Sequence, residues 1–324
     1  MRRRQFITLA GGAIAAALPA WPRAVRAQPA DFPNQTVRIV VPVTAGSTAD
    51  ILARVLADKL APMWNQSVIV ENRPGVAGIS SVAKGPADGY SVMMTSNGHS
   101  AVGVLNKGLA FDPVADLVGV AQVAIIPLVL IVPLSLEAST VKELIVLAKA
   151  KPGSLTAGNG GVGGTAQMDI DLLCAMAGIN IVQVPYRGEA PVMTDVIGGQ
   201  LNMTISSFVG VDQLIQSGKV RALAVTSPKR AVQFPNIPTV ADTVPGYAMD
   251  GWYGIAAPVT VPEAIAARLE KEIVAIVKEP EITKTLIERG FDPAGLPGAE
   301  FAKVIKSDYE KYGKLIRERG IKIE

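Results

Sequence analysis

The sequence predicts an α/β fold with two lobes, each built on a mainly parallel sheet flanked by helices. Short apolar runs recur along the chain, and Gly-rich turns and amphipathic helical segments follow them. That order is typical of parallel strands joined by helices. The chain holds 324 residues, which is enough for two domains of ordinary size. We expect the first lobe at residues 28–132 and 251–324 and the second at 133–250.

Residues 1–27 are predicted to be an export signal rather than part of the fold. Arg2, Arg3 and Arg4 precede Gln-Phe-Ile, a pattern that resembles the twin-arginine signal. The apolar run that follows is too short for a good membrane span. Small residues at Val25 and Ala27 predict cleavage after Ala27 and therefore a periplasmic mature protein. The general secretion route and an uncleaved anchor are the alternatives.

The positive charge of the chain belongs mainly to this leader. The full chain has a net charge of +3 from 31 basic and 28 acidic residues, and five of the arginines lie in residues 1–27. The remaining chain therefore carries 26 basic and 28 acidic residues, a net charge of −2. It has no clustered basic stripe, so we expect no nucleic-acid partner.

Cysteine and histidine are too few for several kinds of site. Cys174 is the only cysteine, which excludes an intrachain disulfide, and its apolar helical neighbours predict a buried, inert thiol. His99 is the only histidine, and no metal-ligand cluster has the usual spacing. We therefore expect neither a metal nor a cofactor.

Apolar runs and helical periodicity place the elements of the first lobe. The helix at Thr48–Ala61 is predicted from Ile51, Leu52, Val55 and Leu56, which share one face. Pro262 in the first turn marks the start of the helix at Pro262–Lys278. Strands are expected at Thr36–Pro42, Ser67–Glu71, Tyr90–Thr95, Leu128–Val132 and Gly251–Pro258, and helices at Thr48–Ala61, Pro262–Lys278 and Gly298–Arg319. The last helix is charged and amphipathic, and we expect it to pack on the first lobe.

The second lobe repeats the strand–turn–helix order. A Pro-Gly turn at Lys151–Gly153 separates its first helix from its first strand. Helices are expected at Thr140–Ala150 and Thr165–Ala177, strands at Leu155–Ala157, Asn180–Pro185, Leu201–Ser206 and Val220–Thr226, and a Gly-rich loop at Gly158–Gly164.

Two Gly-rich turns carry the chemistry that the sequence offers. Gly46-Ser47-Thr48-Ala49 and Gly163-Gly164-Thr165-Ala166 share the pattern G-x-T-A, and each follows a strand and opens a helix. A helix N-terminus presents unpaired N–H groups and partial positive charge, so it favours anions. Facing turns can hold one carboxylate between them. Asp50 would repel an anion and is expected to cap its own helix, with a ligand amine as the alternative.

Six segments together resemble one known family. They read PVTAGSTADILARVLADKL, ENRPGVAGISSVAKGPADGYSVM, VPYRGEAPVMTDVIGGQL, SGKVRALAVTSPKR, FPNIPTVADTVPGY and GWYGIAAP. These segments resemble the Bug proteins, the periplasmic receptors of tripartite tricarboxylate transporters, over residues 33–324. The resemblance implies a type II periplasmic-binding-protein fold that closes around a small carboxylate. It also implies a membrane permease as partner and no enzymatic activity; we expect a monomer.

The resemblance also supplies a list of candidate contacts. They are Thr44, Ala45, Gly46, Ser47, Thr48 and Asp50 in the first turn, Gly161, Val162, Gly163, Gly164, Thr165 and Gln167 in the second, Ser96 and Asn97 after the strand at Tyr90–Thr95, and Ser206 and Ser207 at the end of the strand at Leu201–Ser206. Members that bind amino acids tend to have Asp where this chain has Ser206. The resemblance therefore implies a ligand without an amine, an aliphatic or aromatic mono- or dicarboxylate. Val43 and Gln167 also depart from the common aromatic residue and histidine.

Two enzyme classes are alternatives. Gly158–Gly163 fits the dinucleotide pattern G-x-G-x-x-G, which would suit an exported oxidoreductase, but the strand at Asn180–Pro185 ends without the acid that binds the ribose. Arg187 is a candidate partner for a 2′-phosphate. A hydrolase is disfavoured because the sequence has no G-x-S-x-G and only His99 to act as base.

Three further residues have open roles. His99 follows a strand, so we expect it in a loop or at the cleft rim, with ligand contact as the alternative. Trp252 and Tyr253 are expected to pack in the core or to form a cleft wall against an apolar ligand body.

Overall fold

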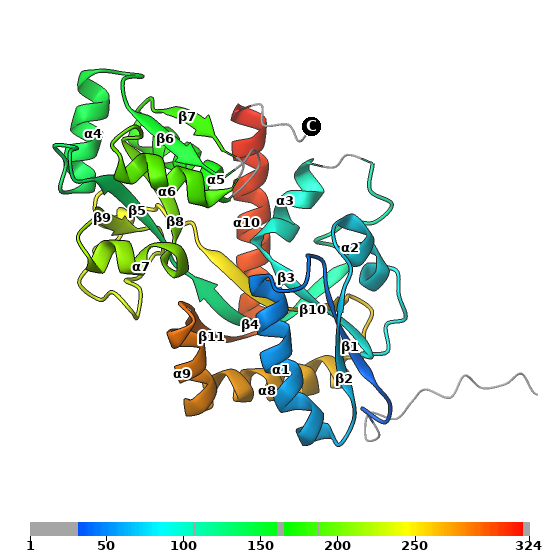
Figure 1. Cartoon of the computed structure of the whole chain (residues 1–324). Coiled ribbons are helices and arrows are strands. Elements are labelled where there is room, and N and C mark those ends of the chain that lie inside the picture. The colour runs from blue at the N-terminus through cyan, green and yellow to red at the C-terminus, as the bar shows by residue number, and fades with distance from the viewer. Residues whose placement is uncertain (1–31, 106–107, 161–164, 187, 320–324) are drawn as a thin grey trace, which may run out of the picture.

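The computed structural model describes residues 32–105, 108–160, 165–186 and 188–319 as two mixed sheets flanked by helices (Figure 1). The expected export signal at residues 1–27 lies outside these described residues. The prediction of an α/β fold with two helix-flanked sheets is confirmed. No helix in the described ranges combines the length and the apolar character needed to cross a membrane.

Six strands form the first sheet, in the order β11-β4-β10-β3-β1-β2. They are β1 (Val37–Val41), β2 (Val68–Asn72), β3 (Ser91–Ser96), β4 (Leu117–Ile126), β10 (Gly251–Pro258) and β11 (Asp292–Pro297). β1 pairs in parallel with β2 and β3, whereas β10 pairs antiparallel with both β3 and β4. The sheet is therefore parallel only on the side where strands and helices alternate along the chain.

Five strands form the second sheet, in the order β7-β6-β8-β5-β9. They are β5 (Leu128–Pro133), β6 (Thr156–Asn159), β7 (Val182–Pro185), β8 (Met203–Ser207) and β9 (Val220–Val225). β6 is parallel to β7 and β8, and β5 runs antiparallel between β8 and β9. Both sheets are thus mixed rather than mainly parallel. In each, the strand that follows a crossing from the other sheet, β10 in the first and β5 in the second, runs antiparallel to its two neighbours.

The strand at Leu128–Val132 was expected in the first lobe, but its pairing places it in the second sheet. β4 ends at Ile126, Pro127 intervenes, and β5 begins at Leu128. Leu130 of β5 pairs with Ile205 of β8. The chain therefore changes sheets at Pro127, five residues before the expected boundary at 132, because β4 and β5 form an almost continuous extended segment.

Helices cover both faces of each sheet. Those with the first sheet are α1 (Thr48–Trp64), α2 (Val76–Ala83), α3 (Asn97–Leu105), α8 (Glu263–Lys278), α9 (Pro280–Glu288) and α10 (Gly298–Arg319); those with the second are α4 (Val141–Ala150), α5 (Thr165–Ala177), α6 (Glu189–Ile197) and α7 (Phe208–Gln216). A 3₁₀ turn, η2, spans Val240–Asp242.

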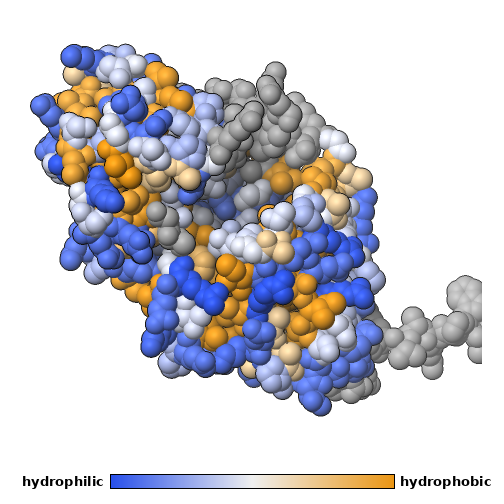
Figure 2. All heavy atoms as spheres, in the orientation of Figure 1, coloured by the Kyte–Doolittle hydropathy of each residue, from blue (hydrophilic) through white to orange (hydrophobic). Residues whose placement is uncertain are grey.

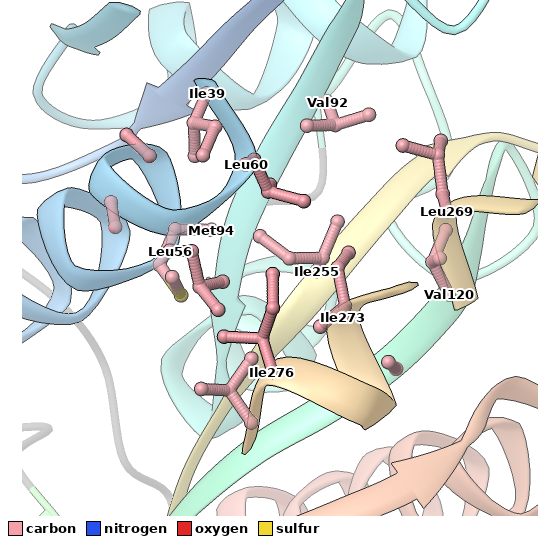
Figure 3. Close-up of a cluster of buried hydrophobic side chains, with 14 of the residues drawn as sticks. Ile39, Leu56, Leu60, Val92, Met94, Val120, Ile255, Leu269, Ile273 and Ile276 are labelled. Atoms are coloured by element: carbon pink, nitrogen blue, oxygen red, sulfur yellow. The ribbon is translucent and has the colours of Figure 1, made fainter. Parts of the chain in front are cut away.

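The largest core lies between the first sheet and helices α1 and α8. Figure 3 shows Leu56 and Leu60 of α1 and Ile273 and Ile276 of α8 gathered around Ile255 of β10. Full burial of each such side chain stabilises the fold by about 1.5–3 kcal/mol. This packing holds β1, β3 and β10 in place, and the candidate site lies at the ends of those strands.

Helix α10 packs on the first sheet, as expected, and also reaches the second. It contacts α3, β4 and α5. In Figure 1 it is the long red helix that runs beside both halves. Phe301 packs edge-on against Trp252 at a centroid distance of 5.1 Å. The indole Nε1 of Trp252 donates to Asp308 Oδ2 at 2.5 Å, so Trp252 is a core residue.

Candidate functional site

A cavity of about 270 Å³ lies between the two sheets. It is lined by Asn97, Ile126, Gly251 and Tyr253 from the first sheet and its helices, and by Leu128, Gly160, Thr165, Ala166, Glu189, Ile205, Ser206 and Ser207 from the second. The face seen in Figure 2 is hollowed between the two halves. Ile126, Leu128 and Ile205 provide apolar wall, and the remaining side chains provide a few directed polar groups, a pattern typical of small-ligand pockets.

Strand order explains why the cavity forms here. In the first sheet the chain passes from β1 to β2 on one side and from β3 to β4 on the other. In the second sheet it passes from β6 to β7 and from β8 to β9, again toward opposite sides. At such a point the loops at the carboxyl ends separate and leave a crevice. Asn97 follows β3, Gly160 follows β6, and Ser207 ends β8. The cavity residues therefore come from the carboxyl ends of parallel strands in both sheets.

Four helices begin at this cavity. Asn97 opens α3, Thr165 opens α5, Glu189 opens α6, and Ser207 is the N-cap of α7. Each N-terminus contributes unpaired N–H groups and partial positive charge. Among the described lining residues there is no lysine or arginine. Helix N-termini are thus the main source of positive potential in the described part of the cavity.

Asn97 and Thr165 join the two halves across the cavity. Asn97 Nδ2 is 3.5 Å from Thr165 Oγ1 and donates to the Tyr312 hydroxyl at 3.2 Å. The Asn97 side chain is buried. Both residues were among the candidate contacts, and the structure brings them together here. Their amide and hydroxyl are neutral hydrogen-bond donors, which suit an anion held between the lobes.

The first Gly-rich turn borders the cavity without lining it. Thr44, Ala45 and Gly46 are exposed. Ser47 is the N-cap of α1, and its hydroxyl accepts from Asp50 N at 3.3 Å. Thr48 shares a hydrogen bond with the Tyr253 hydroxyl, which partly offsets the rise that burial causes in the pKa of Tyr253. Tyr253 thereby links the turn to the cavity wall.

Asp50 corrects one expected contact. Its buried carboxylate accepts hydrogen bonds from Gly46 N at 2.9 Å, from Arg54 and from Asn72 Nδ2 at 3.0 Å. The bond from Arg54 holds the pKa of Asp50 below its ordinary value. All of these donors would compete with a ligand, and Asp50 does not line the cavity. The carboxylate therefore organises the turn instead of meeting a ligand.

The second Gly-rich turn is described only at its two ends. Gly161, Val162, Gly163 and Gly164 lie outside the described residues, as does Arg187. Gly160 and Thr165, on either side of the turn, both line the cavity. Gln167 is half-buried in the first turn of α5, where its carbonyl accepts from Gln183 Nε2 at 3.4 Å, and it is not among the lining residues.

Glu189 lines the cavity and was not expected there. Ser206 Oγ donates to Glu189 Oε2 at 3.2 Å, and Ser206 is buried. The segment Tyr186-Arg187-Gly188-Glu189 follows β7 directly, so its place at a strand end was available from the sequence. The sequence alone does not predict that β6 lies between β7 and β8, and this strand order sets Glu189 beside Ser206. Of the remaining predicted contacts, Ser207 lines the cavity, whereas Ser96 pairs with Tyr253 and does not.

His99 is a buried residue in the first turn of α3, and not in a loop or at a cleft rim. Its Nδ1 lies 2.7 Å from Thr95 Oγ1. Burial lowers the pKa of His99 to about 4, against weaker opposite effects from the Pro113 carbonyl and Asp112. The imidazole is therefore neutral at ordinary pH and is not among the lining residues. Of the aromatic pair, Tyr253 forms cleft wall and Trp252 forms core.

No cluster of three histidine, cysteine or acidic side chains able to hold a metal occurs among the described residues. Cys174 is buried. β7 ends at Pro185 without a carboxylate for a ribose. The described cavity offers hydrogen-bonding groups, helix N-termini and the carboxylate of Glu189.

Comparison with known proteins decides the family. The family model described as "Tripartite tricarboxylate transporter family receptor" matches residues 52–321. The chain belongs to this receptor family. A UPF0065 protein in the tcbD-tcbE intergenic region of Pseudomonas sp. is 33% identical over 90% of this chain and 89% of its own. Protein BugT of Bordetella pertussis is 29% identical over 90% of this chain and 92% of its own.

Solved structures of the receptor family share this fold. R. palustris Rpa4515 with adipate is 33% identical, has a TM-score of 0.71, and is matched over 90% of this chain and 99% of that chain. A TctC solute-binding protein from Polaromonas without ligand is 26% identical, has a TM-score of 0.81, and is matched over 89% and 99% of the two chains. The fold and family are those of a substrate-binding receptor.

Proposed function

We propose that this receptor captures a small aliphatic or aromatic carboxylate between its two lobes and delivers it to the permease of a tripartite tricarboxylate-type transporter. The lobes comprise the first sheet with its helices and the second sheet, β5 to β9, with its own. The protein works in the periplasm as a monomer after cleavage near Ala27, and it catalyses no reaction.

The convergence of helix N-termini is the observation that carries this proposal. α3, α5, α6 and α7 all begin at the cavity. Partial positive charge in an enclosed space stabilises an anion without a lysine or arginine. Asn97 and Thr165 add neutral donors from opposite sides. The relative Rpa4515 is solved with adipate, which is a small carboxylate.

Closure of the lobes follows from the same geometry. Asn97 belongs to the first half and Thr165 to the second, so a carboxylate contacts both only when the halves are together. The ligand then favours the closed arrangement by the difference between its affinities for the two states. A permease that recognises only the closed arrangement would distinguish loaded from empty receptor.

A thermal-shift screen of aliphatic, aromatic, hydroxy and amino acids, followed by calorimetry on the hits, tests the proposal. We expect at least one carboxylate to raise the melting temperature. Thr165→Val should weaken its binding about tenfold, because a hydrogen bond to a charged group is lost. Thr194→Val is the matched control, since the Thr194 hydroxyl bonds only the Ala190 carbonyl of its own helix.

Two results would contradict the proposal. One is a screen in which no carboxylate stabilises the protein. The other is a tight-binding carboxylate whose affinity is unchanged in Thr165→Val, which would place the anion elsewhere. The expectation of an amine-free ligand rested on Ser206 offering only a hydroxyl, and the carboxylate of Glu189 beside it alters that argument.

A further inference from the structure

We propose that Glu189 sets the ligand class of this site: it selects small carboxylates whose far end carries a hydrogen-bond donor or a positive charge, and it disfavours dicarboxylates. This inference rests on the proposed function, because it assumes that one carboxylate end of the ligand enters the cavity.

Glu189 is the only charged side chain among the described residues that line the cavity. The other polar lining groups are the amide of Asn97 and hydroxyl groups, which are neutral. A second carboxylate placed near Glu189 would meet a like charge, whereas an ammonium or hydroxyl group would meet an acceptor. The described lining therefore combines one charged acceptor with neutral polar groups.

The backbone that leads into Glu189 is held against the end of β6 and Gly160. Tyr186 N donates to Asn159 O at 2.9 Å, and Gly188 N donates to Gly160 O at 3.1 Å. These two bonds continue the β6–β7 pairing beyond the ends of the strands. A Cβ atom on Gly160 would lie 3.4 Å from Glu189 Cγ, so the Glu189 side chain lies directly beside Gly160.

The side chain of Glu189 is directed by Ser206. The Ser206 hydroxyl, on the buried end of β8, donates to Glu189 Oε2 at 3.2 Å. A hydroxyl supplies only one proton, so the carboxylate keeps further acceptor positions for a ligand. As the first residue of α6, Glu189 also has its negative charge stabilised by the helix dipole.

Asn97 and Thr165 suit the ligand carboxylate. Asn97 Nδ2 and Thr165 Oγ1 both line the cavity, at the N-termini of α3 and α5. A linear ligand with its carboxylate at this pair and its donor at Glu189 satisfies both ends. A hydroxy or amino acid meets these requirements, and the corresponding dicarboxylate does not.

Two chain-matched panels test the inference by calorimetry at low ionic strength. One contains hexanoate, its ω-hydroxy and ω-amino derivatives, and adipate; the other contains butyrate, its ω-hydroxy and ω-amino derivatives, and succinate. In the wild-type protein, the ω-amino acid of at least one panel should bind about tenfold or more tightly than the dicarboxylate of equal length, the ratio expected for opposite against like charge near a surface.

Glu189→Gln and Glu189→Ala should reduce that ratio about tenfold, because both remove the negative charge. The pair separates loss of charge from gain of an amide donor, which only glutamine provides. Glu263→Gln is the matched control: Glu263 is exposed and is the first residue of α8, as Glu189 is of α6, but it does not line the cavity. Its ratio should stay at the wild-type value.

An unchanged ratio in both Glu189 variants would overturn the inference, and so would carboxylates from the wider screen that bind while no member of either panel does. In both cases the proposed function stands, because a carboxylate still binds. If no carboxylate of any kind binds, the proposed function fails and Glu189 has no ligand to select. Melting temperatures of the variants confirm that each is folded.

Discussion

At Asp50, one buried carboxylate accepts hydrogen bonds from three residues that lie on three different segments. Gly46 belongs to the first Gly-rich turn, Arg54 to the next turn of α1, and Asn72 to the end of β2. The turn therefore depends on a group that does not line the cavity. Each carboxylate oxygen of Asp50 already accepts two hydrogen bonds, so we expect Asp50 to hold the first Gly-rich turn in place rather than to bind a ligand.

Asp50→Ala should lower the free energy of unfolding by about 1–3 kcal/mol, because the hydrogen bonds that a charged carboxylate accepts are lost. It should also weaken carboxylate binding, since the turn that supports Thr48 and Tyr253 loses its anchor. Chemical denaturation and calorimetry measure the two effects. Asp58→Ala, on an exposed face of the same helix, is the control. Equal stability of the two variants would contradict the anchoring role.

At the scale of elements, β10 depends on a position without a side chain. A Cβ atom on Gly254 would lie 2.4 Å from Phe301 Cζ and 2.6 Å from the Ala121 carbonyl oxygen. This close approach lets α10 pack directly on the sheet beside Trp252. It also explains how a long charged helix is held on the first half of the molecule.

Gly254→Ala should destabilise the protein by about 1–3 kcal/mol or more, because the added methyl group meets an aromatic ring and backbone with no room to move. Gly313→Ala provides the contrast within α10. There the nearest atom is the flexible Arg317 Nη1 at 3.2 Å, and alanine favours helix by about 1 kcal/mol. Denaturant midpoints that fall equally in both variants would argue against close packing at Gly254.

Local pattern explains which elements were predictable. Apolar runs predicted β1, β3 and β10, and periodicity and caps predicted α1, α4 and α8. β4 was not predicted, because Gly119 and Gln122 interrupt its apolar run. β11 contains two prolines and a glycine and lies at a sheet edge, where pairing with β4 decides its conformation. Pairing between segments that are distant in the sequence cannot be predicted from a short stretch of residues.

The same reasoning applies to the site. Asn97, Thr165, Ser206 and Ser207 were among the candidate contacts that the family resemblance implied, and all four line the cavity. Glu189 was missed because its importance depends on the order of β7, β6 and β8. Asp50 was expected to cap its own helix and was also listed as a candidate contact, because its side-chain partners, above all Asn72 on another strand, were unknown.

Over the whole molecule, three aspartates from different parts meet where the halves join. Asp169 comes from α5, Asp308 from α10, and Asp250 from the crossing segment before β10. Asp169 Oδ2 and Asp250 Oδ1 are buried without a hydrogen-bond partner, and Lys311 pairs with Asp308 at 3.1 Å. Burial, together with Asp250 and Asp308, raises the pKa of Asp169 well above its ordinary value.

Burial, with the nearby charge of Asp308, raises the pKa of Asp250 from 3.8 to about 7. The folded protein therefore holds this proton more tightly than the unfolded chain. Its contribution to stability is complete below about pH 4 and is lost as the pH rises through about 7, with a slope of at most about 1.4 kcal/mol per pH unit. Lys311 and Asp292 also act on this carboxyl group, in opposite directions.

Asp250→Asn should thus gain stability relative to wild type as the pH rises from 4 to 8, because asparagine does not titrate. Denaturation at intervals across this range measures the difference between the two proteins. Comparing the two proteins at each pH is necessary because His99, whose pKa is lowered to about 4, changes the stability of both with the opposite sign. The contribution of His99 to stability is present above about pH 6.5 and is lost as the pH falls through 4. A constant difference would contradict the assignment to Asp250.

The position of β10 between β3 and β4 has a consequence for synthesis. All five strands of the second sheet precede β10 along the chain, and both neighbours of β4 follow them. A growing chain therefore makes one complete sheet while β4 has no partner and β3 has one open edge. Unpaired edges invite association with other chains. Until the ribosome has produced the last part of the protein, the half made first is the half that cannot yet fold.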